Sequence, residues 1–212
     1  MKNLTDLFKL LEATRAVPQT GYAMIGFRQS ELSNLAEHHY LVTFFAWQLA
    51  SHLKRKGARI NIQKVLEFSL VHDLGELFGG DISMVYGSLN PKAKKLAKAF
   101  ESENQNFLAK FFGTEEGYFK SLSNEILDAK SDEAIVAKVA DYLEIIYYRF
   151  YVKGMSKFSR VIADKLENKI KMLKDPIAKR ELRKFLRIWS REYPKRDIVE
   201  ILSSVTLLKR KK

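Results

Sequence analysis

The chain has 212 residues, which fits one domain and is long enough to bury a hydrophobic core without disulfide or metal crosslinks. It contains no cysteine, which excludes disulfide frameworks, cysteine-ligated zinc, iron–sulfur clusters and thiol nucleophiles, so any metal must be bound by histidine and carboxylate side chains. The net charge of +12 comes entirely from residues 152–212, with 19 Lys/Arg and 7 Asp/Glu, because residues 1–151 hold 18 of each and form a neutral body.

Apolar residues recur at three- and four-residue spacing through nearly every segment, whereas alternation with a period of two is scarce. This pattern predicts an all-α protein. The first segment has helical spacing and lacks the continuous apolar stretch of a secretion signal, so we predict an ordinary helix there. In chain order, the predicted helices span 2–14, 34–56, 61–72, 75–86, 91–112, 115–129, 131–152, 156–174, 177–192 and 195–208.

The predicted helix 34–56 is apolar almost all round between Tyr40 and Ala50, which indicates a central buried helix. That stretch is too short to cross a bilayer, which takes about 20 residues. We therefore expect a cytoplasmic protein with no membrane segment. Apolar positions continue at helical spacing through the basic quarter. We therefore divide the chain into a domain at 1–154 and a basic helical extension at 155–212 that packs on it.

Reactive side chains directly follow the second apolar helix, in the segment VHDLGELFGGD at 71–81. His72 and Asp73 are adjacent, so on a regular helix they point about 100° apart. Both can face one ion only at a helix end or kink, which Gly75 would permit. A lone His-Asp pair is more often a capped helix end than a metal site, so further ligands are needed to indicate chemistry.

Two other predicted helices supply such candidates. Glu37-His38-His39 lies near the start of helix 34–56, and we interpret His39 as a packing residue because it faces about 100° away from His38. Asp141 lies in the apolar stretch AIVAKVADYLEIIYY, where a carboxylate is costly to bury unless it is paired or binds a metal. Taken alone, Asp141 is better explained by a salt bridge to Lys or Arg.

Taken together, the order H…HD…D resembles the HD superfamily of metal-dependent phosphohydrolases, and more narrowly its small 5′-deoxynucleotidase branch. The matching segments, which lie between residue 10 and about 150, are QTGY at 19–22, LSNLAEH at 32–38, HDLGELFGGD at 72–81 and SDEAIVAKVADYLE at 131–144. The resemblance implies an HD-domain helical bundle, here with additional C-terminal helices. It also implies release of phosphate from deoxynucleoside 5′-monophosphates, and a homodimer.

The resemblance assigns roles to individual residues. Glu76 matches the acid that assists the attacking water, and Asp81 matches a residue that contacts the sugar of the nucleotide. The residues that match the ligands of one divalent metal ion are His38, His72, Asp73 and Asp141. Imidazole and carboxylate groups form a mixed set suited to Mn²⁺, Co²⁺, Zn²⁺, Ni²⁺ or Mg²⁺.

Two positions of the first matching segment depart from the pattern of the branch. Gln19 stands where the branch has an Arg that engages the substrate phosphate, and Tyr22 stands where it has a Trp. A neutral amide cannot replace the charged, bidentate grip of a guanidinium on phosphate. Our hypothesis is that Arg15 or Arg28, which flank the same loop, supplies the charge from a different position.

Two alternatives stay open. The chain could hydrolyse another nucleotide or phosphoester within the same superfamily. It could instead be a binding module whose basic C-terminus contacts nucleic acid, with Phe185, Trp189 and Tyr193 as stacking residues. We do not expect nucleic acid as a partner, because these aromatic residues lie four apart and form one apolar helix stripe. The complete set of matching metal-site residues also favours an enzyme.

Overall fold

The computed structural model of the chain describes residues 2–154, 160–192 and 198–209. Within these ranges it forms ten α-helices and five 3₁₀ helices and no strand, which confirms the predicted all-α class. The α-helices are α1 (Lys2–Glu12), α2 (Leu35–Arg55), α3 (Ile62–Val71), α4 (Met84–Leu89), α5 (Pro91–Ala109), α6 (Glu116–Asp128), α7 (Asp132–Lys153), α8 (Arg160–Met172), α9 (Pro176–Glu192) and α10 (Ile198–Lys209). The 3₁₀ helices are η1 (Ala13–Arg15), η2 (Thr20–Ile25), η3 (Gln29–Glu31), η4 (Leu74–Phe78) and η5 (Lys110–Glu115).

The predicted helix 75–86 is wrong. The segment instead forms the short η4, then an irregular stretch, and then α4. Gly79 and Gly80 have φ angles of +93° and +109°, a region that residues with a Cβ rarely adopt. A Cβ on Gly80 would also lie 2.7 Å from a ring carbon of Phe100. The two glycines therefore end the helix and turn the chain toward α5.

The centre of the molecule is built from α2, α3 and α7, which pack together. Val42 and Ala46 of α2 and Val136 and Val139 of α7 are fully buried there, and Val65 of α3 joins them. A second apolar cluster joins the other side of α3 to α1, α5 and α6. Because three helices meet in one core, their ends and inward faces are held in fixed relative positions, which is what a polar site needs.

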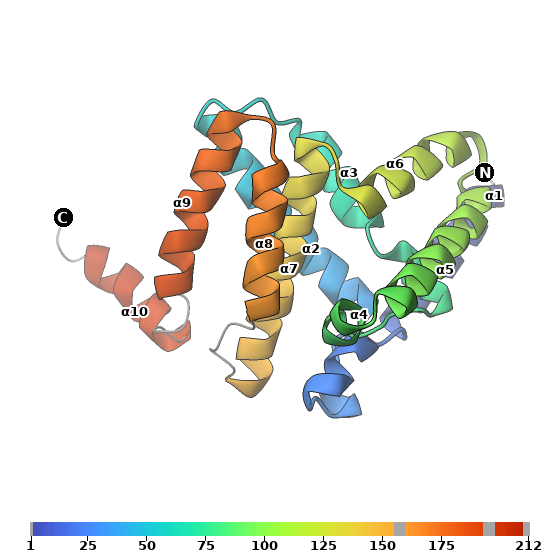
Figure 1. The fold of residues 1–212 in the computed structure, drawn as a ribbon, viewed down its shortest axis with the longest axis horizontal. Coiled ribbons are helices and arrows are strands. Elements are labelled where there is room, and N and C mark those ends of the chain that lie inside the picture. Colours follow the sequence, from blue (N-terminus) through green and yellow to red (C-terminus); the bar gives the residue numbers. More distant parts are fainter. Residues whose placement is uncertain (1, 155–159, 193–197, 210–212) are drawn as a thin grey trace.

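The helices α8 and α9 add to the same core, and Figure 1 shows α8 beside α7 and α9 beside α8. Leu166 and Ile170 of α8 and Leu182 of α9 are almost completely buried. Trp189 is only 5% exposed and Phe185 is partly buried against the core, so both belong to the apolar stripe of α9 rather than to its charged face. Tyr193, the third aromatic residue of the binding-module alternative, lies outside the described residues.

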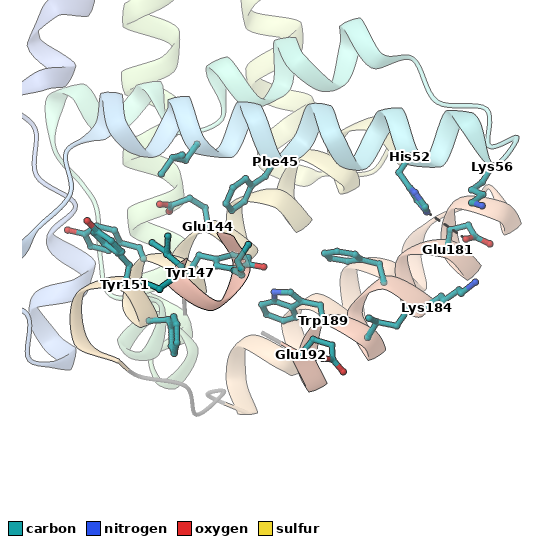
Figure 2. A pocket seen from close by; sticks show the side chains of 18 residues that line it. Phe45, His52, Lys56, Glu144, Tyr147, Tyr151, Glu181, Lys184, Trp189 and Glu192 are labelled. Carbon is teal, nitrogen blue, oxygen red and sulfur yellow. Dashed lines mark ion pairs between the residues drawn. The ribbon is translucent and has the colours of Figure 1, made fainter. Parts of the chain in front are cut away.

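A groove of about 1050 Å³ lies between α2, α7, α9 and α10. Figure 2 shows Phe45, Tyr147 and Trp189 along its wall, with His52 and Glu181 3.8 Å apart at one end. The lining is mainly aliphatic and aromatic. None of the described helices is long and apolar enough to span a membrane.

The burial of α8 generates a prediction about stability. Leu166→Ala should lower the free energy of unfolding by about 2–5 kcal/mol, because it leaves a cavity in the core. Leu96→Ala removes the same atoms from a side chain that is 62% exposed and should change stability little. Thermal unfolding monitored by circular dichroism compares the two. Equal melting temperatures would contradict the packing of α8, as would a soluble, fully folded chain truncated after Gly154.

Candidate metal centre

Four polar side chains from three helices converge beside the central core. His38 lies in the first turn of α2, which begins at the N-cap Asn34, and Asp141 lies midway along α7. His72 is the residue at which α3 ends, and Asp73 precedes η4. Each of the four, His38, His72, Asp73 and Asp141, offers one ligand atom, and these atoms all lie within 4.8 Å of one another.

The distances define a compact centre. The Nε2 atoms of His38 and His72 are 3.2 Å apart. From Nε2 of His38, Oδ2 of Asp73 lies at 3.6 Å and Oδ1 of Asp141 at 3.5 Å. From Nε2 of His72, Oδ2 of Asp73 lies at 3.3 Å. Two imidazole nitrogens and two carboxylate oxygens therefore surround one point, as in a mixed His and Asp metal site.

The other nitrogen of each imidazole has an acceptor of its own. Nδ1 of His38 lies 2.7 Å from Oε2 of Glu144, and Nδ1 of His72 lies 2.8 Å from the carbonyl oxygen of Ser69. These acceptors favour a proton on both Nδ1 atoms, which leaves the lone pairs of both Nε2 atoms directed at the centre. Two such lone pairs need a positive charge between them, which either a proton on one Nε2 atom or a metal cation can supply.

The electrostatics of the centre also favour positive charge. Burial lowers the pKa of His38, but the carboxylates of Asp141, Asp73 and Glu144 outweigh it and raise that pKa well above its usual value. Burial raises the pKa of Asp141, but Lys138 and the hydrogen bond to His38 bring it down to about 2. The centre therefore holds ionised carboxylates at neutral pH and stabilises a cation among them.

Lys138 binds the outer oxygens of the two aspartates. Its Nζ lies 3.3 Å from Oδ1 of Asp73 and 3.2 Å from Oδ2 of Asp141, whereas the oxygens that face the histidines are the other two. Lys138 therefore positions both carboxylates without taking their ligand atoms. The salt bridge considered for Asp141 is present, and it coexists with a place among the ligands. Sequence reasoning missed this role of Lys138, although its spacing of three residues from Asp141 on a helix was a signal.

His39 packs beside the centre, as the sequence predicted. Its ring centroid lies 4.7 Å from that of His72, and burial, together with the charge of His72, lowers its pKa well below the usual value. A neutral imidazole at this position adds packing without adding charge.

A cavity of about 400 Å³ opens over the centre. Glu76 of η4 and Asp81 line it, together with His38, Asp73 and Asp141. Burial, and then the charges of Asp73, Asp81 and Glu101, raise the pKa of Glu76 well above its usual value. The cavity therefore places a strongly basic carboxylate beside the ligand set.

Asp81 ties the loop of residues 19–22 to the cavity. Its Oδ2 accepts hydrogen bonds from the Gly21 backbone N–H at 2.6 Å and from the Thr20 hydroxyl at 3.2 Å. A Cβ on Gly21 would lie only 3.2 Å from Oδ1 of Asp81, which explains the need for glycine there. Gln19 and Tyr22 line the cavity as a result.

Glu101 of α5 also lines the cavity, and sequence reasoning missed it. Burial and the charge of Asp73 raise its pKa to about 7. No motif marks this residue, because it reaches the cavity only through the packing of α5 against η4.

The two arginines suggested for phosphate binding lie away from the cavity. Arg15 forms an exposed ion pair with Glu12 at 2.7 Å, and Arg28 precedes η3, where its backbone N–H donates to Glu31. Neither residue is among those that line the cavity. The cationic residues that do line it are Lys94, Lys138, Arg149 and Lys165.

The comparisons with known proteins agree with this geometry. The HD domain family model matches residues 11–183 of the chain. The protein named 5′-deoxynucleotidase HDDC2 of Dictyostelium discoideum is 26% identical over 174 residues, which cover 81% of this chain and 85% of the relative. The protein of the same name from Danio rerio is 26% identical over 151 residues, which cover 69% of this chain and 68% of the relative.

Solved structures share the fold. A protein from Pyrococcus horikoshii aligns with a TM-score of 0.63 and 24% identity, covering 88% of this chain and 98% of that protein. An HD-domain phosphohydrolase from Listeria innocua aligns with a TM-score of 0.65 and 18% identity, covering 87% of this chain and 86% of that protein. At these identities, the likeness establishes the helical architecture alone.

The ligand set predicts the metal content. The purified chain should carry about one divalent ion, and His72→Ala should lose it, because two imidazoles and two carboxylates form one site. His52→Ala, which changes a histidine on another part of α2, should keep the ion. Elemental analysis by mass spectrometry measures both. A His72→Ala protein that retains stoichiometric metal would contradict the assignment.

The contacts of Lys138 predict a metal-dependent stability. In the metal-free protein, Lys138→Met leaves two buried carboxylates without their cation, which should cost roughly 3 kcal/mol, or about 6–12 °C in melting temperature. Added divalent metal should restore much of the loss by neutralising the same carboxylates. Lys130→Met removes a solvent-exposed partner of Asp128 and should have little effect. Equal destabilisation with and without metal in calorimetry would contradict this role of Lys138.

Proposed function

The chain belongs to the HD domain family and is a metal-dependent phosphohydrolase, and from this premise we propose that its substrates are deoxynucleoside 5′-monophosphates. The hydrolase activity is supported above all by one observation. Four side chains converge beneath a cavity that also contains Glu76, namely those of His38, His72, Asp73 and Asp141. The substrate class rests on the two 26% identical relatives named 5′-deoxynucleotidase and on the motif residues that line the cavity.

The metal ion, when bound, supplies Lewis-acid polarisation of the phosphoryl group and activates water at neutral pH. The chain's own contribution starts with orientation. Glu144 and the Ser69 carbonyl fix the two imidazole rings, and Lys138 fixes the two aspartates. Ligands held in this way do not have to reorganise during the reaction, which lowers its barrier.

Glu76 transfers a proton from the attacking water to the departing sugar oxygen. Its raised pKa makes it a strong proton acceptor whenever it is ionised, so its carboxylate takes a proton from the attacking water. The oxygen of that water forms the new bond to phosphorus, and the bond from phosphorus to the sugar oxygen breaks. The protonated carboxyl of Glu76 then returns a proton to the departing sugar oxygen. The products are a deoxynucleoside and inorganic phosphate.

Gln19, Tyr22 and Asp81 form the substrate-facing wall. The hydroxyl of Tyr22 is buried and has no hydrogen-bond partner within the described parts of the chain. An unpaired buried hydroxyl is costly unless a ligand completes it, which supports a substrate contact at this residue. Asp81 keeps this wall in place through Gly21 and Thr20, beside the position proposed for the sugar.

We also propose that two chains form a homodimer in the cytoplasm. Tyr40, Phe44 and Trp47 are each more than 40% exposed, and they follow one another along one face of α2. An exposed aromatic stripe of this kind supports a protein interface.

The role of Glu76 predicts a variant that binds metal without turnover. Glu76→Gln keeps the shape of the side chain but removes its basicity, and it should lower kcat by roughly 10²–10⁴-fold. Glu103→Gln makes the same change on the exposed face of α5, and the kcat of this variant should equal that of the wild-type enzyme. Phosphate release from deoxyadenosine monophosphate, with metal content measured in parallel, tests this role. A metal-loaded Glu76→Gln enzyme with unchanged kcat would mean that another group moves the proton.

A further inference from the structure

Substrate phosphate requires positive charge, and the structure shows which cations are available to it. Of the four cationic side chains that line the cavity, Lys138 is engaged by Asp73 and Asp141, and Arg149 has an interaction of its own. Lys94 and Lys165 form no ion pair or side-chain hydrogen bond within the described residues. Their positive charge is therefore not used by an ion pair or side-chain hydrogen bond among the described residues, and a ligand in this cavity can bind it.

These two lysines come from distant parts of the chain. Lys94 lies in the first turn of α5, and Lys165 lies in the middle of α8, within the basic C-terminal quarter. Burial, and then the positive charge of Lys94, lower the pKa of Lys165 to about 8. Like charges brought together on two elements raise the energy of the free protein, and a bound anion would remove that cost.

The surroundings extend the same charge. Lys169 lies one turn after Lys165 on α8, and its pKa is lowered by burial and then by Lys138, Lys98 and Lys94. Lys98 itself is paired with Asp128 at 2.8 Å, so it is partly neutralised. Lys94 and Lys165 therefore place positive charge on α5 and α8, whereas the lining carboxylates, apart from Glu101 of α5, lie on or beside η4 and α7. A cleft with this division attracts an anion and directs it toward the metal ligands.

We propose that Lys94 and Lys165 bind the phosphate group of the substrate and supply the positive charge that Gln19 lacks. The inference rests on the proposed function, because it assigns the anion of the substrate to these two residues. Lysine binds phosphate as a point charge, so two lysines on opposite helices can grip one group without the planar geometry of arginine. Gln19 and Tyr22, on another part of the lining, offer neutral hydrogen-bond donors to the same substrate.

The assignment gives α8 a functional role. Ile162 of the same helix also lines the cavity and is buried in the central core, so the core fixes the position of Lys165 three residues later. The basic C-terminal quarter then supplies part of the substrate site, in addition to covering α7.

The test compares two double variants with equal changes in charge. Lys94→Met/Lys165→Met removes the proposed pair, and Lys95→Met/Lys171→Met removes two exposed lysines of the same helices that do not line the cavity. We expect the first to lower kcat/KM at least tenfold, about 1.4 kcal/mol, for both deoxyadenosine monophosphate and p-nitrophenyl phosphate, because both carry the recognised group. The second should stay within twofold of wild type. Lys94→Met/Lys165→Arg should recover much of the loss, since one cation returns.

A binding measurement separates this inference from the proposed function. Calorimetric titration of Co²⁺-loaded protein with inorganic phosphate should show weaker binding in Lys94→Met/Lys165→Met, whereas binding of deoxyadenosine should not change. If wild type releases phosphate from no nucleotide but phosphate binding still depends on the two lysines, the proposed function fails and the inference stands. If both double variants bind phosphate equally well, the inference is overturned. A loss of phosphate binding confined to Arg15→Met or Arg28→Met would likewise overturn it. Phosphate binding would then be assigned to the arginines that flank the loop of residues 19–22.

Discussion

The structure depends on holding two imidazole nitrogens 3.2 Å apart with two carboxylates around them. Such a group is unfavourable by itself, because lone pairs and negative charges face one another in a buried place. Two sets of contacts lower this energetic cost. Glu144 and the Ser69 carbonyl determine which nitrogen of each ring carries the proton, and Lys138 neutralises the carboxylates from behind. A divalent cation at the centre would complete the balance of charge, so the same arrangement that costs energy without metal selects for it.

The apolar core keeps this arrangement in place. Ala46 on α2 and Ala140 on α7 are fully buried small residues of the central core, and they allow the two backbones to approach closely. Phe68 of α3 fills the other side, one turn before His72. A shift of any of these helices would move a ligand, so packing and metal geometry constrain each other.

The sequence predicted those features that depend on local patterns. The helices followed from apolar spacing, whereas the candidate ligands were assigned through the resemblance of short motifs to those of the HD superfamily. The helix expected at 75–86 was wrong because its apolar spacing hid the effect of Gly79 and Gly80, whose backbone conformations no helix contains. Glu101 and Lys165 escaped detection for a different reason. Each reaches the cavity only through the packing of a distant helix, and spacing within one helix does not show which face will meet another element.

The basic C-terminal quarter illustrates how composition alone can mislead. An excess of positive charge with aromatic residues between the charges suggests a surface for nucleic acid, yet Trp189 is buried and Phe185 packs inward. The charge then divides between two environments. Exposed lysines such as Lys171 are solvated, whereas Lys165 faces the cavity and is half-buried there. Because Gln19 removes a cation from one wall of the cavity, a helix outside the recognised motifs can restore the balance from another wall. Charge complementarity to a phosphate is a property of the whole cavity, so it can persist when the residue that usually provides it has changed.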